Sequence, residues 1–440
     1  YQKVFQVVNS LKFGKRIILQ EYGDPVVHSM EDIDLDALLE ANKHWRKSLG
    51  LSVDPIRIEN IGKEFVTLRA EAVTGVVRAG LMDIEIVPKF LSGTNDCWQS
   101  ILWRILTVVE GGYIDDNFTS AHQFDSLSVP DLLTEIFLAS FAKGAARGLP
   151  QSYLAKRESG NTLRGQLDYS RLGEWLARPW VLPYIADLLT NDTPLARLIR
   201  WTAQCLATTV KSLGRSRALL EIAASLAHVR KSPPCLLDAQ RIYLGPQHKG
   251  LEAALFIGLL LLQGAGVHHA SGKYSLSGFL WNSDAIYENY IYWLCQRAAN
   301  LRGKRITKAE KKFGQVIMGE GDLLKTTPDV IFHDADGVPS AVTDAKYKRF
   351  NSRPKAQDTY QVLTAGHILG CQRVSLTYPV AINSAPTVWL VPSALGGKNI
   401  ELTALPLNLM QLALPEGHEV LINVIGDWLD GYYVSQMPKN

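Results

Sequence analysis

Apolar and polar residues alternate in short runs over the first ninety positions of the 440-residue chain. The clearest run is MDIEIV at 82–87, in which Met82, Ile84 and Ile86 are separated by acidic residues. Alternation with a period of two is typical of a half-buried strand. Several such runs at close spacing predict a small antiparallel sheet or barrel, with one helix expected at 34–49 from its apolar spacing.

Helical spacing replaces the alternation from residue 96 onward. Apolar residues recur every three or four positions at 98–106 and 130–146, and most of 169–268 has the same spacing. Pro130 stands where proline favours the first turn of a helix. This part of the chain is therefore predicted to be mostly helical.

Helices and strands mix from residue 283 to the end. Helical spacing is found at 284–294, 357–369 and 416–429, and strand-like runs at 314–318, 330–332, 373–378 and 386–391. This order predicts a mixed sheet with helices on its faces. The chain is thus expected to be an α+β multidomain protein, because its length suits two or three domains. The predicted parts are an N-terminal β-rich domain with following helices at 1–145, a mostly helical middle region at 146–280 and a C-terminal α/β domain at 281–440.

A hairpin signal lies within the C-terminal part. Asp336-Gly337 separates two strand-like runs, and an Asp-Gly pair is typical of a two-residue type I′ turn. With this pair as the loop, Asp329 lies opposite Asp344 on the neighbouring strand. Because successive side chains alternate between faces, Asp344 and Lys346 share one face. The sequence therefore predicts two carboxylates and one ammonium at one edge of a hairpin.

Such a trio suits phosphodiester hydrolysis. Carboxylates on opposed strands, with Cβ atoms about 5 Å apart, repel unless a cation lies between them. Mg²⁺, with Mn²⁺ as an alternative, binds one or two carboxylates while it keeps several waters and reaches phosphate. Such a metal activates a water, and a neighbouring lysine orients it or offsets developing charge. A surface hairpin with ordinary charges is the alternative, but Asp329 and Asp344 adjoin apolar runs.

Charge is uneven along the chain. The net charge of +3 is too small to make the whole surface a nucleic-acid site. The span 297–355 holds 13 Lys and Arg against 7 Asp and Glu, a local surplus of +6 around the acidic centre. This surplus suits a site that cleaves phosphodiesters. For 308–312 a solvated charged face remains an alternative.

Cysteine usage and hydropathy indicate a cytoplasmic protein. The five cysteines are far apart and form no C-x-x-C pair, so neither a zinc ribbon nor a disulfide scaffold is indicated. The opening YQKVFQVVNS lacks a signal-peptide pattern. The longest apolar run, 253–262, is too short to span a bilayer and is expected to be a buried helix, so no membrane partner is predicted. No phosphate-binding G-x-x-x-x-G-K-[ST] motif occurs, so any nucleotide hydrolysis would come from another chain.

Several motifs resemble one known family. Pro328-Asp329 followed by Asp344-Ala345-Lys346 resembles the signature of the PD-(D/E)xK nuclease superfamily. The run DAKYK at 344–348, followed by DTYQ at 358–361, is similar to McrC proteins, the nuclease subunits of McrBC-type (5-methylcytosine) restriction systems. Further similar pieces are Asn282 with Tyr287-Glu288, RGQLD at 164–168, NDTP at 191–194 with Arg197-Leu198, GVV at 75–77 and IVPK at 86–89.

The resemblance implies roles for individual residues. Asp329, Asp344 and Lys346 would be catalytic, and the two aspartates would hold the metal. Glu288 would be an added metal ligand, with an exposed acid on a helix surface as the equal alternative. Gln361 would lie near the site and hold the lysine or a metal-bound water.

Two tyrosines accompany these motifs. Tyr347 and Tyr360 are expected to pack beside the sheet at least as readily as to serve the site.

The resemblance also implies partners. A hexameric AAA+ GTPase ring would receive residues 1–145, and double-stranded DNA would be cut when the nuclease domains of two assemblies pair. Candidate contacts to the ring are Arg16, Arg57, Arg69, Arg78 and Lys89. The expected function is a Mg²⁺-dependent DNA endonuclease subunit of a McrBC-like restriction or phage-defence complex. The alternatives are a stand-alone repair or junction nuclease of the same superfamily and a non-catalytic adaptor that stimulates an AAA+ motor.

Overall fold

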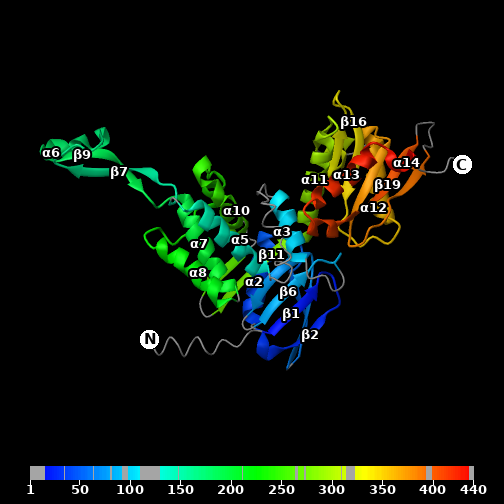
Figure 1. The fold of residues 1–440 in the computed structure, drawn as a ribbon, viewed down its shortest axis with the longest axis horizontal. Coiled ribbons are helices and arrows are strands. Elements are labelled where there is room, and N and C mark those ends of the chain that lie inside the picture. Colours follow the sequence, from blue (N-terminus) through cyan, green and yellow to red (C-terminus); the bar gives the residue numbers. More distant parts are fainter. Residues whose placement is uncertain are drawn as a thin grey trace. The chain divides into compact units, whose positions relative to one another are not determined.

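The protein is a mixed α+β chain with several sheets (Figure 1). The computed structural model describes residues 15–33, 35–62, 64–79, 82–91, 98–109, 129–146, 148–210, 212–262, 266–271, 274–308, 310–313, 323–392 and 399–435. It divides into two compact units, one made of 1–129 with 269–440 and the other of 130–268. The division differs from the three consecutive parts expected from the sequence, because the first unit is built from both ends of the chain. None of the described helices is long and apolar enough to cross a membrane.

The N-terminal part of the first unit holds two sheets. The larger has the order β1-β6-β5-β11-β10, and the smaller has the order β2-β4-β3. These strands are β1 (Lys15–Gln20), β2 (Val26–Ser29), β3 (Ile56–Ile61), β4 (Phe65–Ala70), β5 (Val73–Ala79), β6 (Met82–Val87), β10 (Gly266–Ser271) and β11 (Tyr274–Asn282). The β-rich character expected for this region is confirmed. β11 was not predicted, since its partner β5 is about two hundred positions away in the sequence.

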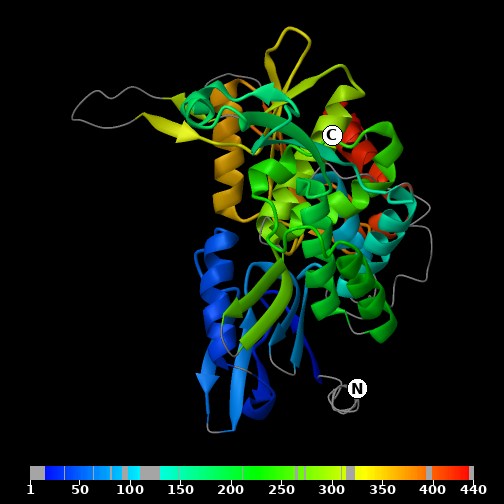
Figure 2. The same ribbon diagram turned by 90° about the vertical axis from the view of Figure 1, so that its left-hand side faces the viewer.

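Helix α2 (Leu35–Ser48) packs beside these strands and is the blue helix of Figure 2. Its Trp45 is fully buried. Asn42 donates from Nδ2 to the carbonyl of Ile56 (2.7 Å) and accepts from the Ile56 amide (3.2 Å). A single side chain thus satisfies both polar groups at the start of β3, which fixes the helix on the sheet.

The C-terminal part of the first unit is a six-stranded sheet with the order β12-β15-β16-β17-β19-β18. The strands are β12 (Arg305–Thr307), β15 (Val330–His333), β16 (Pro339–Ala345), β17 (Arg373–Val380), β18 (Thr387–Val391) and β19 (Ile400–Asn408). β16, β17 and β19 run parallel and the remaining pairs are antiparallel, so the expected mixed sheet is confirmed. A two-stranded ribbon, β13 (Lys311–Phe313) with β14 (Leu324–Thr326), precedes β15. The strand expected at 314–318 lies outside the described residues.

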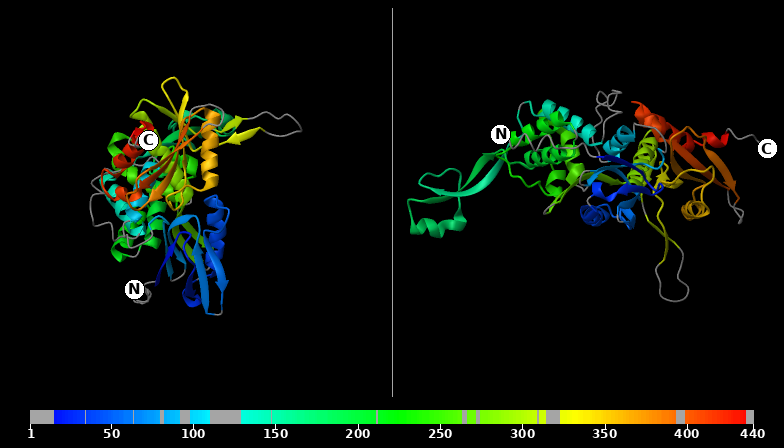
Figure 3. Two further views of the ribbon diagram at one scale, coloured as in Figure 1. Left: turned by 90° about the vertical axis from the view of Figure 1, so that its right-hand side faces the viewer. Right: turned by 90° about the horizontal axis from the view of Figure 1, so that it is seen from below.

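Helices cover both faces of this sheet. α12 (Ala356–Leu369), the orange helix of Figures 2 and 3, packs through Val362 and Ala365 on Val342. Phe332 faces the other way and contacts Trp428 of α13 (Gly417–Leu429). α11 (Ser283–Asn300) packs against α13 on that second face. Its N-cap is Asn282, whose Oδ1 accepts from the Ala285 amide (3.1 Å).

The second unit consists of helices and one extended arm. The helices are α5 (Val129–Gly144), α7 (Pro194–Thr209), α8 (Leu213–Ser225), α9 (Leu236–Gln240) and α10 (Glu252–Leu260). The arm is formed by β7 (Ser152–Gly160), β8 (Gln166–Leu167), α6 (Leu172–Ala177) and β9 (Leu182–Thr190). It reaches away from the helices of its own unit (Figures 1 and 3).

The strands of the arm correct the expectation of a mostly helical middle region. β7 and β9 pair along nine residues each. β7 is exposed along most of its length, so it lacks the one-sided apolar alternation by which a strand is recognised in a sequence.

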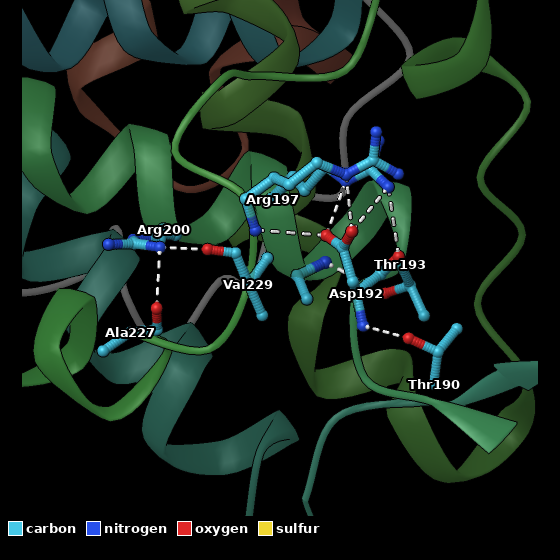
Figure 4. A network of polar contacts seen from close by, with 9 residues as sticks. Thr190, Asp192, Thr193, Arg197, Arg200, Ala227 and Val229 are labelled. Carbon is cyan, nitrogen blue, oxygen red and sulfur yellow. Dashed lines mark hydrogen bonds and ion pairs between the residues drawn. The ribbon is translucent and has the colours of Figure 1, made fainter.

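A charge network holds the base of the arm (Figure 4). Asp192, two residues after β9, accepts from Arg197 (2.6 and 2.9 Å) and from Arg230 (2.6 Å). The hydrogen bonds from Arg197, with those from Arg230, hold the pKa of Asp192 far below its usual range. Thr193 caps α7 by accepting from the Ala196 amide (3.1 Å). The NDTP motif at 191–194 therefore joins the arm to the helices.

Candidate active site

The predicted hairpin is formed by β15 and β16. Val330, Ile331 and Phe332 pair with Thr343, Val342 and Ala341, which is the register expected from the sequence. This register places Asp329, just before β15, at the level of Asp344.

The turn that joins the two strands differs from the predicted two-residue type I′ turn. Asp334 pairs with Val338, the Gly337 amide donates to the Asp334 carbonyl (3.1 Å), and only Gly337 in the loop has a positive φ (80°). This is a three-residue loop with glycine in the left-handed position. The Asp334 carboxylate stabilises it by accepting from the amides of Asp336 and Val338. An irregularity next to His333 then restores the expected register.

Asp344 lies near the end of a central strand. β16 has β15 on one side and β17 on the other, and Asp344 is only 3% exposed. Lys346, two residues on, forms an ion pair with Oδ2 of Asp344, so the two side chains share a face as predicted. The amide of Lys346 continues the ladder by donating to the Thr377 carbonyl (2.9 Å). The sheet thus fixes both groups through its backbone.

Asp329 completes the pair of carboxylates. Its Oδ2 accepts from the Ala345 amide (2.8 Å), which brings it to the end of β16. Burial and the neighbouring charge of Asp344 raise the pKa of Asp329 to about 7, although the Ala345 amide acts in the opposite direction. Burial is the larger of the two causes, and together they disfavour a second negative charge beside Asp344.

Helix α12 supplies the partners of the lysines. Lys346 donates from Nζ to Oε1 of Gln361 (3.1 Å), so the structure brings Gln361 to the predicted lysine. Asp358, three residues earlier and 4% exposed, accepts from Lys348 at both oxygens (2.8 and 2.9 Å). Its Oδ1 also lies 3.9 Å from Nζ of Lys346. Asp358 was not singled out from the sequence, but its spacing from Gln361 puts both residues on one helical face.

Glu288 lies on α11 and is half-buried. Its carboxylate is 3.9 Å from Nζ of Lys308. Burial raises its pKa, Lys308 acts in the opposite direction, and Asp284 and Asp344 raise it further. The described residues include no group of three His, Cys, Asp or Glu side chains close enough to hold one metal ion together. The role of Glu288 as an added ligand therefore stays a prediction.

The two aspartates suit a hard cation. The Oδ2 atom of Asp344 is buried and accepts no hydrogen bond within the described part of the chain, although Lys346 is in ionic contact with it. The ammonium of Lys346 pairs with Asp344, whereas Asp329 accepts from the backbone amide of Ala345. Carboxylate oxygens in such a place are the donors that Mg²⁺ and Mn²⁺ prefer.

The two tyrosines of the motif differ in environment. Tyr347 is buried and packs against Tyr287 of α11 (5.5 Å between ring centroids), as expected. Tyr360 is 67% exposed, so packing beside the sheet, one of its two alternatives, is not what the structure shows. Its place on α12 turns its side chain to solvent, while Val362 two residues later is buried.

Comparison with known proteins places this site in a family. The family model described as McrBC 5-methylcytosine restriction system component matches residues 68–379. The chain belongs to this family. The matched span includes the hairpin, Lys346 and Gln361, and the resemblance to McrC is confirmed. A search of curated proteins found no match.

Solved structures show the same fold. A chain in the refined half-complex of Thermococcus gammatolerans McrB AAA+ hexamers with bound McrC aligns with a TM-score of 0.66 and 16% identity. The alignment covers 94% of this chain and 100% of that one. A chain in the cryo-EM structure of the Thermococcus gammatolerans McrBC complex aligns with a TM-score of 0.46 and 17% identity, over 64% of this chain and 88% of that one. The McrC fold therefore extends over nearly the whole length of this family member.

Proposed function

We propose that this McrBC family member is a Mg²⁺-dependent DNA endonuclease subunit that works with an AAA+ motor ring. The observation that carries the proposal is the convergence of Asp329, Asp344, Lys346 and Gln361 at the end of β16. These four side chains come from the residue before β15, from β16, from the segment after β16 and from helix α12. Two carboxylates lie with one ammonium among them, an arrangement that suits a divalent cation.

Asp329 and Asp344 would hold the cation, and Glu288 is the candidate for a third carboxylate. When bound, a divalent cation polarises the phosphodiester and lowers the pKa of a water. Lys346 would orient the attacking water and stabilise the charge that develops on phosphate. Gln361, by accepting from Nζ of Lys346, would keep the ammonium directed at the reacting group.

The loop between β16 and α12 offers a surface for the DNA backbone. Arg349, Arg353 and Lys355 are exposed there and form no ion pair within the described residues. We expect Arg353→Ala and Lys355→Ala to weaken binding to all duplex sequences alike. Each lost phosphate contact should reduce the slope of log affinity against log salt concentration by about 0.9. If this slope were unchanged in both variants, the DNA backbone would not bind at this loop.

The arm is the surface we propose for the motor ring. Three of the five ring contacts expected in the N-terminal part suit this role poorly, because Arg57 and Arg69 pair with Glu71 and Lys89 is buried. Exposed apolar side chains instead gather on the arm, which is a mark of an interaction site. They include Tyr153 (73% exposed), Tyr169 (72%), Leu176 (77%) and Trp180 (71%).

Support for a ring partner comes from the relative whose structure holds McrB AAA+ hexamers with bound McrC. We expect the double change Leu176→Ser with Trp180→Ser to prevent assembly with an AAA+ GTPase ring of the McrB type, as measured by size-exclusion chromatography with light scattering. The exposed pair Leu301→Ser with Ile382→Ser, outside the arm, serves as the control. Assembly of the arm variant with wild-type affinity would move the contact elsewhere.

The decisive test of the nuclease assignment is Asp344→Ala. The variant, assembled with its motor, should lose DNA cleavage by at least about 10³-fold while it still folds and assembles. Asp336→Ala is the matched control, since Asp336 is an exposed aspartate in the turn of the same hairpin. Cleavage by Asp344→Ala at the rate of Asp336→Ala would refute the assignment.

Two other functions make different predictions for the wild-type protein. A stand-alone nuclease would cut duplex DNA with Mg²⁺ in the absence of any motor. A non-catalytic adaptor would stimulate the motor but would bind no Mn²⁺ at Asp329 and Asp344, which calorimetry on wild type and Asp344→Ala would reveal.

A further inference from the structure

A buried polar contact joins the N-terminal sheets to the residue that follows Lys346. Glu21, directly after β1, is fully buried. Its Oε2 accepts from the hydroxyl of Tyr347 (2.8 Å) and from the backbone amide of Lys89 (3.2 Å). Tyr347 and Glu21 are 326 positions apart in the sequence. Two regions that are distant in the chain thus meet one residue from the candidate catalytic lysine.

Lys89 strengthens this contact from the other side. Its ammonium lies 3.9 Å from the centroid of the Tyr347 ring and 4.6 Å from that of Tyr22. It is 8% exposed, and its Nζ lies 4.0 Å from Oδ1 of Asp284. A desolvated ammonium over an aromatic face is held more firmly than an exposed one. The Tyr347 ring is therefore fixed by its hydroxyl, by a cation and by the rings around it.

The rings around Tyr347 come from both regions. Phe90 contacts it edge-on from the N-terminal side (6.0 Å), and Tyr287 of α11 contacts it from the nuclease side (5.5 Å). Tyr22, next to Glu21, has a positive φ (53°), a conformation that costs free energy for a residue other than glycine. Such a backbone is retained only where its surroundings hold it.

Tyr347 in turn limits where Lys346 can lie. The Lys346 amide donates to Thr377, and the Lys348 amide donates to the Lys346 carbonyl (2.7 Å), so the segment 346–348 is a tight turn. Rotation of the Tyr347 ring out of its site would move both neighbouring lysines. Lys346 would then lose its place beside Asp344 and Gln361.

We propose that Glu21 and Lys89 are positioning residues for the nuclease site, acting through Tyr347 to hold Lys346 in place. The inference rests on the proposed function for its effect on cleavage. It assigns to the N-terminal sheets a direct role in the geometry of the site. Neither residue touches the reacting groups, so their loss should lower the rate without removing it.

The test uses the full chain with Tyr347→Phe, which removes only the hydroxyl, and Glu21→Gln, which keeps the shape of the side chain. Tyr243→Phe and Glu40→Gln are the matched controls, because both side chains are exposed. In the assembled complex we expect kcat for DNA cleavage to fall roughly tenfold in both test variants, with KM for DNA unchanged, since misplacement of a catalytic group acts on the chemical step.

Hydrogen exchange gives a second readout that does not depend on cleavage. In the chain without its partner, the amides of 346–348 should exchange about tenfold faster in Tyr347→Phe and Glu21→Gln than in the controls, since loosened segments open more often. Wild-type kcat in both test variants, or exchange at 346–348 equal to that of the controls, would overturn the inference. A wild-type complex that cuts no DNA would instead refute the proposed function, while the exchange result would still decide whether Glu21 holds the segment.

Discussion

Two clusters of charged side chains in this protein differ in their ratio of cationic groups to carboxylates. At the base of the arm, one carboxylate, Asp192, is matched by two guanidinium groups, and its pKa is lowered. At the end of β16, Asp329 and Asp344 lie together, Lys346 pairs with Asp344, and burial with the charge of Asp344 raises the pKa of Asp329. The first cluster is satisfied by its own residues and holds the fold. In the second, two carboxylates lie with one ammonium, an arrangement that suits a divalent cation.

The two clusters should differ most in the free energy of unfolding that is lost when one cationic side chain is removed from each. Lys346→Ala leaves the buried carboxylate of Asp344 without its ammonium, so we expect a loss of about 3 kcal/mol in the free energy of unfolding of the metal-free protein. Arg230→Ala is the counterpart at the arm, where Arg230 is 63% exposed and Arg197 remains, and should cost less than about 1 kcal/mol. Urea unfolding of both variants gives the values. Equal losses would remove the distinction between the clusters.

The pH dependence of stability should have opposite signs at the two clusters. The pKa of Asp329 is about 7 in the folded protein against an ordinary 3.8, so the folded state binds the proton more tightly. Its stabilising contribution is present below pH 4 and is lost as the pH rises through 7, on the order of 2 kcal/mol in metal-free protein. The pKa of Asp192 is lowered, so its contribution is present above pH 4 and is lost as the pH falls.

Unfolding of wild type and Asp329→Asn between pH 5 and 8 measures the first contribution. The stability difference should shift in favour of Asp329→Asn with rising pH, and Mg²⁺ should stabilise only the wild type. A difference that stays constant over this range would mean that Asp329 ionises normally.

Asp192→Asn should weaken the arm without touching the chemistry. The change removes the charge that two arginines bind, so a loss of about 1–2 kcal/mol in the free energy of unfolding is expected. DNA cleavage measured with an excess of the motor should stay near the wild-type rate. A loss of cleavage in folded, assembled Asp192→Asn would show that this cluster also serves the reaction.

Gln361→Ala should give the smallest effect. Lys346 keeps Asp344 and Asp358 as neighbours, so the change only loosens the orientation of its ammonium. We expect cleavage to slow about fivefold to tenfold, which corresponds to about 1 kcal/mol in the barrier. Gln357→Ala, an exposed glutamine one turn earlier on α12, is the control. The rate constant for a single turnover is the quantity to compare.

The sequence predicted those parts of the site that local patterns determine. The alternation of side chains along β15 and β16 was enough to bring Asp329 to the level of Asp344 and to put Lys346 on the same face. Gln361 followed from a family motif, and its hydrogen bond to Lys346 agrees with that. The turn type was wrong because an irregularity at His333 compensates for a longer loop, which no pattern of apolar residues records.

The sequence did not predict contacts between residues that are far apart in the chain. Glu21 and Tyr347 meet only because two sheets come together, and nothing near Glu21 marks it as buried. The arm was missed for the opposite reason, since strands exposed on both faces carry no apolar signal. Asp358 was present in the quoted motif, but its contact with Lys348 depends on how α12 lies on the sheet.

The position of strand β11 decides where the chain can be cut to make an expression fragment. By pairing it belongs with β5, yet its last residue, Asn282, caps the helix that carries Glu288. A fragment that starts at residue 281 would leave the N-terminal sheet without one strand, and would deprive α11 of the carbonyl of Leu49 to which Asn282 donates (3.2 Å). An expression fragment that keeps both halves whole therefore needs 1–129 together with 266–440, so that β10 and β11 stay complete.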